Sequence, residues 1–480
     1  MSMNKILVII LFLLFVNPGY AQPYLSNLKI DIQPSSHDEG TLCMYKLVVE
    51  QEFENIKETS FTLKLENIGR FSLLIKQAFF PKIAVYCKQS GSDGKWNTVD
   101  FIFDGQNLEC NLPDSNKNVK IEYDYYSDYI TKVPDKYVNQ VSFFNYYNYD
   151  WNSWYFTNPD VHLNRATFRV PDSVFFFVDS SGKRVGNEIE LMPEDMENLQ
   201  TGHLSFYMLE KDYYHTEIFQ NGRNPVQLFM TKGVIISEDS IHYKPDTLSN
   251  QEICFRRNKT KQILNLLSSF FNPSKTIEIN IADGYLTSGT DDGQQYIWGQ
   301  TVKMGKDKDL ILMDTSAWKD DINFIHELIH LYTPHHVSKE APEHYFLEES
   351  LVEFLAVCLA YEKPEIKDSV FNKKIAYFKK LNMPATSIFQ VSDNQYSYSQ
   401  EGGGTGSIIY QEVPYLLHQF AKKIGEEKML VILKDFYSRT PEDGKYLNYF
   451  EETMKRNGVS EEEWQSLIKS LLTPGNSLTN

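Results

Sequence analysis

The sequence predicts a multidomain α+β protein, with an all-β amino-terminal domain ahead of a mostly helical domain that contains a small sheet. Its 480 residues exceed what one hydrophobic core usually serves, which favours two domains. Residues 24–214 consist of short alternating runs of Val, Ile, Phe and Tyr between turn-forming residues, as in β-strands. After a polar stretch at 220–225 the pattern changes to mixed strands and long helices. We therefore expect the two domains at residues 22–222 and 223–480.

Residues 1–21 are typical of a secretory signal peptide. A single lysine precedes an apolar run from Ile6 to Val16, and cleavage is expected before Gln22. The run is shorter than the ~20 apolar residues that a spanning helix needs, so a membrane anchor is the less favoured alternative. We expect the chain to be exported, to a periplasm or to the medium, with no stable membrane span after signal cleavage.

Within the first domain, residues 45–50 and 60–65 show the alternation expected of half-buried strands.

The formal net charge of −17 argues against a nucleic-acid partner. Five cysteines are too few and too scattered for a disulfide scaffold, although an exported protein could pair two of the first three, Cys43, Cys87 and Cys110.

In the second domain we expect a helix over 263–271 and strands over 276–281 and 296–304. Two helices that carry metal ligands follow, and helices then continue to the end of the chain. Cys358 lies in an apolar helical run and is expected to be buried. A capping box formed by Ser460 and Glu463 should begin the last helix.

Residues 326–330 read His-Glu-Leu-Ile-His, the pattern of a catalytic zinc site. Helical positions four apart differ by about 40° in direction, so His326 and His330 point their imidazoles toward the same spot. Catalytic zinc takes three protein ligands and leaves the fourth position to water. Glu349, nineteen positions after His330, supplies the third. We expect one Zn²⁺ at this site.

The segment around the motif favours a helix, because Asp320 or Asp321 can cap its start and Pro334 can end it. Glu353 lies four residues after Glu349 and is a candidate to orient one of the ligating imidazoles, although it could equally be a helix neighbour without a role. The histidines at 335, 336 and 344 are expected to be surface residues and not ligands.

The chemistry that fits these residues is amide hydrolysis. Zinc lowers the pKa of a coordinated water, and Glu327 is placed to accept its proton and pass it to the leaving amine. The oxyanion of the tetrahedral intermediate also requires a hydrogen-bond donor, which spacing alone does not identify.

The motif, eighteen intervening residues and Phe346-Leu347-Glu348-Glu349-Ser350 together resemble the gluzincins of the aminopeptidase N-like family, peptidase family M1, whose second segment reads Trp-Leu-Asn-Glu-Gly. The resemblance implies a β saddle or sandwich domain followed by a thermolysin-like catalytic domain, and a peptide or protein substrate. In that family a tyrosine about sixty residues further on, at the start of a helix, donates to the oxyanion. Tyr410 looks like its counterpart.

Four features depart from that family's pattern. The Gly-x-Met-Glu-Asn segment that anchors a substrate amino terminus is missing, and residues 298–301 stand near its place, so Gly299 and Gln300 are the candidate substrate contacts. Residues 331–334 replace Trp-x-Gly-Asn, and Glu348 replaces Asn. We also expect the chain to lack the family's large helical carboxy-terminal domain.

Several functions therefore remain open. Aminopeptidase-like cleavage is the leading hypothesis, and an endopeptidase or a glycyl-aminopeptidase-like gluzincin is the alternative. A zinc enzyme acting on an epoxide or ester, and a non-catalytic binding protein stabilised by zinc, are further readings.

Overall fold

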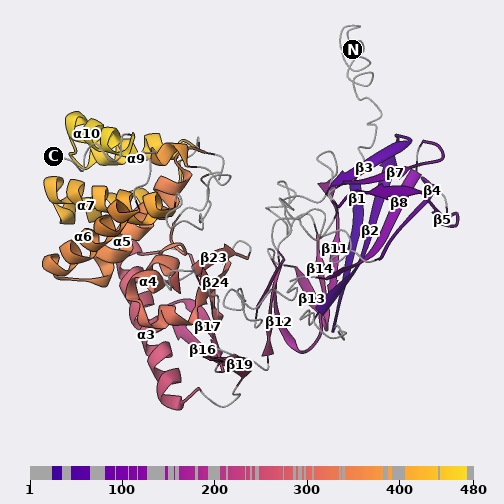
Figure 1. Ribbon diagram of the computed structural model, residues 1–480, viewed down its shortest axis with the longest axis horizontal. Helices are drawn as coiled ribbons and strands as arrows, with labels where there is room; N and C mark the ends of the chain where they lie inside the picture. The colour runs from indigo at the N-terminus through magenta and orange to yellow at the C-terminus, as the bar shows by residue number, and fades with distance from the viewer. Residues whose placement is uncertain are drawn as a thin grey trace, which may run out of the picture. The chain divides into compact units, whose positions relative to one another are not determined.

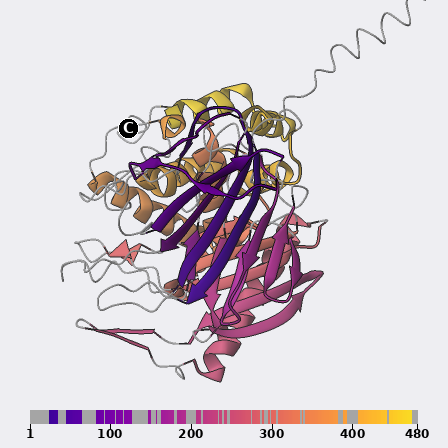
Figure 2. The ribbon, with the colours of Figure 1, turned by 90° about the vertical axis from the view of Figure 1, so that its right-hand side faces the viewer.

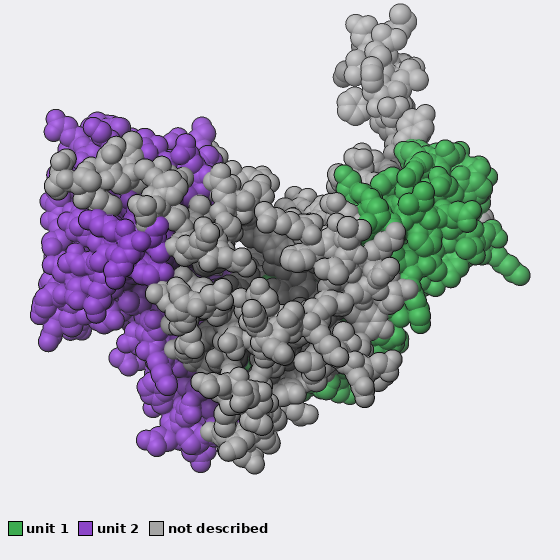
Figure 3. Space-filling view, in the orientation of Figure 1, with its two compact units in different colours: residues 1–138, 144–214, 303–306 green, residues 139–143, 215–302, 307–480 purple. Residues whose placement is uncertain are grey.

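The computed structural model divides into two compact units, residues 1–138, 144–214 and 303–306 in the first and residues 139–143, 215–302 and 307–480 in the second (Figure 3). The predicted boundary at 222–223 lies in the turn between the first two strands of the second unit. The residues described are 24–34, 45–64, 82–91, 93–105, 107–115, 117–126, 146–149, 156, 162–178, 182–192, 206–211, 214–232, 234–237, 240–243, 248–273, 275–284, 288–289, 295–296, 299–304, 307–333, 337, 341–381, 387–391, 406–441 and 444–472.

The first unit is built from β-strands, as predicted (Figure 1). Among its described residues nine strands form the largest sheet, in the order β13-β14-β11-β1-β2-β8-β4-β5, with β10 also paired to β1. Figure 2 shows its long strands side by side. The strands are β1 (Tyr24–Pro34), β2 (Tyr45–Ile56), β4 (Lys82–Gln89), β5 (Asn97–Thr98), β8 (Lys117–Tyr126), β10 (His162–Leu163), β11 (Ala166–Arg169), β13 (Lys183–Val185) and β14 (Glu188–Leu191).

Two smaller sheets accompany it, and apolar residues of alternating strand positions fill its core. The small sheets are β3-β7-β6 (Ser60–Lys64, Asn107–Asn111 and Phe101–Phe103) and β12-β15-β9 (Val174–Val178, Phe206–Glu210 and Tyr146–Tyr149). Strand β3 shows this alternation, because successive side chains of a strand point to opposite faces of the sheet. Phe61 and Leu63 are buried, and the three other residues of the strand are exposed. Cys87 and Cys110 are buried free thiols, and Cys43 lies outside the described residues.

The second unit contains a five-stranded sheet in the order β16-β17-β20-β24-β23, counted over its described residues. Its strands are β16 (Tyr214–Asn221), β17 (Asn224–Thr231), β20 (Glu278–Gly284), β23 (Gly299–Lys303) and β24 (Lys308–Asp314). Strands β17, β20 and β24 run parallel, with Leu228 opposite Ile281 and Ile281 opposite Ile311. All three of these residues are buried, as expected for a parallel sheet covered on both faces. Short two-stranded pairs are β18-β19 (Val234–Ser237, Ser240–Tyr243) and β21-β22 (Ser288–Gly289, Gln295–Tyr296).

Helices make up most of the remainder of this unit (Figure 1). They are α3 (Asn250–Phe271), α4 (Asp321–Ile329), α5 (Leu351–Ala360), α6 (Pro364–Lys380), α7 (Val413–Ile424), α8 (Glu426–Tyr437), α9 (Tyr446–Arg456) and α10 (Glu461–Leu472). A β domain followed by a mostly helical region with a small sheet confirms the predicted fold class. In the described part of the chain, every helix is too short or too polar to cross a membrane.

The predicted helices and strands differ from the observed ones mainly in where they begin and end. The helix expected over 263–271 is the end of α3, which begins at Asn250 because Ser249 caps it. The strand expected over 296–304 is divided between β22 and β23. The capping box is present, with Glu463 accepting from the Ser460 N–H at 2.9 Å and Ser460 Oγ accepting from the Glu463 N–H at 3.2 Å.

A buried polar cluster fixes the connection into α4. Asp283, at the carboxyl end of β20, is fully buried and accepts hydrogen bonds from Arg256 Nη1 at 2.6 Å and Trp318 Nε1 at 2.9 Å. The Thr231 N–H donates to the same carboxylate at 2.7 Å. Because Trp318 lies three residues before the first residue of α4, these bonds hold the start of that helix against the sheet.

Candidate metal centre

Helix α4 carries His326, and His330 is the residue that caps its carboxyl end. Asp320 caps it by accepting from the N–H groups of Ile322 at 3.0 Å and Asn323 at 3.2 Å. Its apolar face packs into the core, with Phe324 and Leu328 fully buried. The helix ends at Ile329, and Pro334, expected to end it, lies outside the described residues.

Glu349 lies in a π-helical turn, Tyr345–Ser350, that leads directly into α5. Residues 351–358 are all buried, including Glu353 at 4% exposure and Cys358 at 5%. Close packing around this buried helix restricts where the Glu353 carboxylate can lie.

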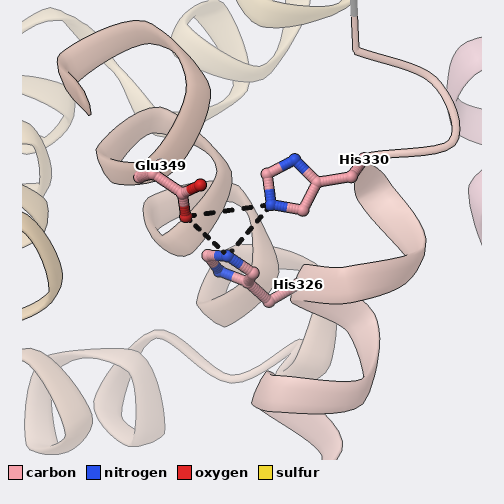
Figure 4. Close-up of side chains that lie close together, drawn as sticks. All are labelled: His326, His330 and Glu349. Atoms are coloured by element: carbon pink, nitrogen blue, oxygen red, sulfur yellow. Dashed lines mark hydrogen bonds and ion pairs between the residues drawn. The ribbon is translucent and has the colours of Figure 1, made fainter. Parts of the chain in front are cut away.

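His326, His330 and Glu349 converge from these two elements (Figure 4). His326 Nε2 lies 3.2 Å from His330 Nε2 and 3.3 Å from Glu349 Oε2, and the third side of the triangle, His330 Nε2 to Glu349 Oε2, is 3.9 Å. Donor atoms bound tetrahedrally to zinc at about 2.0–2.1 Å are separated by roughly 3.3 Å. The three residues therefore fit a metal ion of this size with little rearrangement.

Charge and burial in this triangle favour a cation. Burial alone would lower the pKa of His326, but hydrogen bonds to Glu349 and Glu353 outweigh burial and raise the pKa to about 10. Burial would likewise raise the pKa of Glu349, yet the neighbouring imidazoles lower it to about 2. A proton on His326 thus occupies the place of a metal ion, which must displace it on binding.

Glu353, the residue expected to orient an imidazole, accepts from His326 Nδ1 through Oε2 at 2.8 Å. This bond leaves Nε2 of the same ring directed at the triangle. The other oxygen, Oε1, accepts from Lys374 Nζ.

Glu327 lies beside the triangle with its carboxylate against β23. Thr301 Oγ1 donates to the Glu327 carbonyl oxygen at 2.8 Å and lies 3.4 Å from Oε2. A Cβ on Gly299 would meet Glu327 Oε1 at 2.3 Å, so the backbone at Gly299 touches the carboxylate. Burial is the main reason that the pKa of Glu327 rises to about 7, with the charge of His326 opposing it. Gln300 contributes backbone to β23, and its side chain lies outside the described part.

Tyr410 reaches the triangle from a second π-helical turn, Ile408–Glu412, just ahead of α7. Its hydroxyl donates to Glu349 Oε2 at 2.9 Å. Ser350 Oγ donates to the Ile409 carbonyl at 2.9 Å and joins the two π turns.

The sequence alone did not identify Thr301, Ser350 or Lys374. Each contacts its partner from another element, and their side chains have no diagnostic spacing. Of the loop histidines, His344 contacts the Val337 carbonyl at 3.0 Å, and His335 and His336 lie outside the described residues. Glu348 is buried. The pKa values of Tyr437 and Tyr446 are raised, mainly by burial and secondly by the charge of Glu348.

The chain resembles known proteins in its fold. No family model matches the chain, and no curated protein matches it. Among solved structures, an aminopeptidase N family protein from Idiomarina loihiensis matches 93% of this chain and 76% of its own, at 11% identity and a TM-score of 0.53. The chain has the fold of that aminopeptidase N family protein.

Two further solved structures match most of this chain. An M1 zinc metallopeptidase from Deinococcus radiodurans is matched over 94% of both chains at 10% identity and a TM-score of 0.46. Legionella pneumophila aminopeptidase A in complex with aspartic acid is matched over 94% of this chain and 49% of its own, at 10% identity and a TM-score of 0.48.

Proposed function

We propose that the chain is a zinc-dependent metallopeptidase that hydrolyses peptide bonds. The observation that carries this proposal is the donor triangle of His326, His330 and Glu349 beside the buried carboxylate of Glu327. A site that only stabilised the fold would have four protein ligands and no need of a base. The aminopeptidase N fold supports the same function.

Two nitrogens and one carboxylate oxygen form a donor set that suits zinc, and three protein ligands leave a position for water. A zinc ion held there supplies Lewis acidity and a coordinated water of lowered pKa. The His326 ring is oriented for this role by Glu353, and Glu349 is held by the Tyr410 hydroxyl.

The remaining residues handle protons and charge. Glu327, buried beside the donor triangle, accepts the proton of the attacking water and delivers it to the leaving amine. The Tyr410 hydroxyl, whose single proton goes to Glu349 Oε2 in this structure, would turn to donate to the oxyanion when Glu349 binds the metal.

Aminopeptidase-like cleavage is the proposed specificity, with an endopeptidase as second candidate. One observation favours the second: β23, whose Gly299 touches Glu327, reads Gly-Gln-Thr-Val-Lys and has no carboxylate to hold a free amino terminus. The signal-like residues 1–21 support export as a further part of the proposal.

The test is digestion of a mixed library of free and amino-terminally blocked peptides by the mature protein, with and without a chelator, read by mass spectrometry. Glu327→Gln is the matched control, because it preserves size and metal ligands. Chelator-sensitive trimming of free ends supports an aminopeptidase, and internal cuts support an endopeptidase. If the wild type cleaves no peptide, or if Glu327→Gln cleaves as fast as wild type, the proposed mechanism is wrong.

A further inference from the structure

Lys374, on α6, lies between two parts of the candidate metal centre. Its Nζ donates to Glu353 Oε1 and, at 3.2 Å, to the carbonyl oxygen of Tyr410. The lysine side chain is 15% exposed and that of Glu353 is 5% exposed, so water competes weakly for these bonds. The two acceptors belong to segments 21 and 36 residues away along the chain.

On one side, Lys374 stabilises the carboxylate that orients a metal ligand. Glu353 uses its other oxygen to hold His326 Nδ1 at 2.8 Å. Lys374 donates to the remaining oxygen, Oε1, so the positive charge faces this buried carboxylate directly. Without the Lys374 ammonium, the negative charge of Glu353 would be buried with less compensation, and the carboxylate would shift away from its present position.

On the other side, Lys374 satisfies a backbone carbonyl that cannot be satisfied within an α-helix. Pro414, at the start of α7, has no N–H, so the carbonyl of Tyr410, four residues earlier, lacks its α-helical donor. The N–H of Val413 donates to Ile408, which is the π-helical pattern. The Lys374 ammonium donates to this carbonyl from outside the helix.

We propose that Lys374 is a positioning residue that holds in one arrangement the carboxylate orienting His326 and the backbone that directs the Tyr410 hydroxyl to Glu349. Lys374 bonds to neither the metal-donor atoms nor the Tyr410 hydroxyl, and it acts through Glu353 and the peptide group of Tyr410. The inference rests on the proposed function for the catalytic importance of His326 and Tyr410, but its contacts can be tested without a substrate.

The first experiment measures zinc affinity by competition with a chromophoric chelator in three variants of the full chain. Lys374→Met should bind zinc about 10- to 100-fold more weakly, the usual effect of losing a partner that orients a ligand. Lys374→Arg should recover most of this loss, because a guanidinium can donate to both acceptors. Lys373→Met is the matched control: Lys373 is exposed on the same helix, and its variant should bind zinc within about twofold of wild type.

The second experiment is amide hydrogen exchange on the metal-free protein. Lys374→Met should accelerate exchange over residues 408–413, while exchange over 461–472, in α10, stays unchanged. If Lys374→Met unfolds, the double variant Lys374→Met with Glu353→Gln removes both charges, and it should still show the faster exchange over 408–413.

Unchanged zinc affinity in Lys374→Met overturns the coupling to His326, and unchanged exchange over 408–413 overturns the coupling to Tyr410. Equal losses in Lys373→Met would show a general effect of charge on α6 and would also contradict the proposal. If Lys374→Met binds zinc more weakly but the wild type cleaves no peptide, the positioning role is supported and the proposed function is contradicted.

Discussion

Glu327 is a buried carboxylate whose pKa is raised to about 7, chiefly by burial. When folding raises the pKa of an acid, the free energy of unfolding begins to fall as the pH rises above the pKa of that acid in the unfolded chain. The loss of stability is complete once the pH exceeds its pKa in the folded protein. In the metal-free protein the ionised form is therefore unfavourable at pH 8 and causes little loss at pH 4. Catalysis needs that same ionised form, so stability and activity oppose each other at this residue.

Replacing this carboxylate should separate the two effects. Glu327→Gln should raise the free energy of unfolding of the metal-free protein at pH 8 by about 1–3 kcal/mol, and by much less at pH 4. It should also lower kcat about 10²- to 10⁴-fold at full zinc content. Denaturant unfolding at the two pH values and steady-state kinetics check both effects, and lower stability at pH 8 would contradict this account of Glu327.

The Tyr410 hydroxyl should matter for rate and not for metal content. Tyr410→Phe removes the donor but keeps the ring beside His326, whose centroid is 5.9 Å from that of Tyr410. We expect kcat to fall roughly 10²-fold, the usual effect of one oxyanion donor, with zinc still bound. Tyr415→Phe, on the following helix, is a matched control. An unaffected rate in Tyr410→Phe would exclude Tyr410 from the site.

Zinc affinity should depend on pH through His326. Because its pKa is about 10 without metal, zinc displaces one proton from this ring over the neutral range. Affinity should therefore fall about tenfold for each pH unit of acidification between pH 8 and pH 6. Titration against a chelator of known protonation constants measures the slope, and a slope of zero would mean that His326 is not protonated in the metal-free site.

At the scale of elements, β23 and α4 approach closely at the general base. Gly299 is required because a Cβ there would lie 2.3 Å from Glu327 Oε1. Gly299→Ala should displace the carboxylate and lower kcat by about 10²-fold, as a misplacement of about 1 Å can, without loss of zinc. Thr301→Ser, which keeps the hydroxyl on the same strand, is the control. Normal kcat in Gly299→Ala would show that β23 does not constrain the base.

Elements with a regular spacing of residues could be predicted from the sequence, but the contacts between elements could not. The four-residue spacing of His326 and His330 and the cap at Asp320 follow from helical geometry, and the structure shows both. The π turns that carry Glu349 and Tyr410 have no comparable periodicity, although Pro414 marks where α-helical bonding fails. Lys374 and Thr301 act across segments 20 to 40 residues apart, and their roles depend on tertiary packing.

At the scale of the whole molecule, the two units have separate hydrophobic cores, and the candidate metal centre belongs to the second. The change from strand-like alternation to helical periodicity is the sequence pattern from which two domains were predicted. The order of strands β16-β17-β20-β24-β23 was not predictable, because pairing between distant strands depends on three-dimensional packing and not on local pattern.

The most direct test of the metal centre is zinc content by atomic emission in the wild type, Glu349→Gln and Glu348→Gln. The two variants change neighbouring buried or half-buried carboxylates by the same chemical step, but only Glu349 lies in the triangle. We predict one zinc per chain in the wild type and in Glu348→Gln, and loss of most of the zinc in Glu349→Gln. Full zinc content in Glu349→Gln, or loss in Glu348→Gln alone, would contradict the assignment of His326, His330 and Glu349 as the ligands.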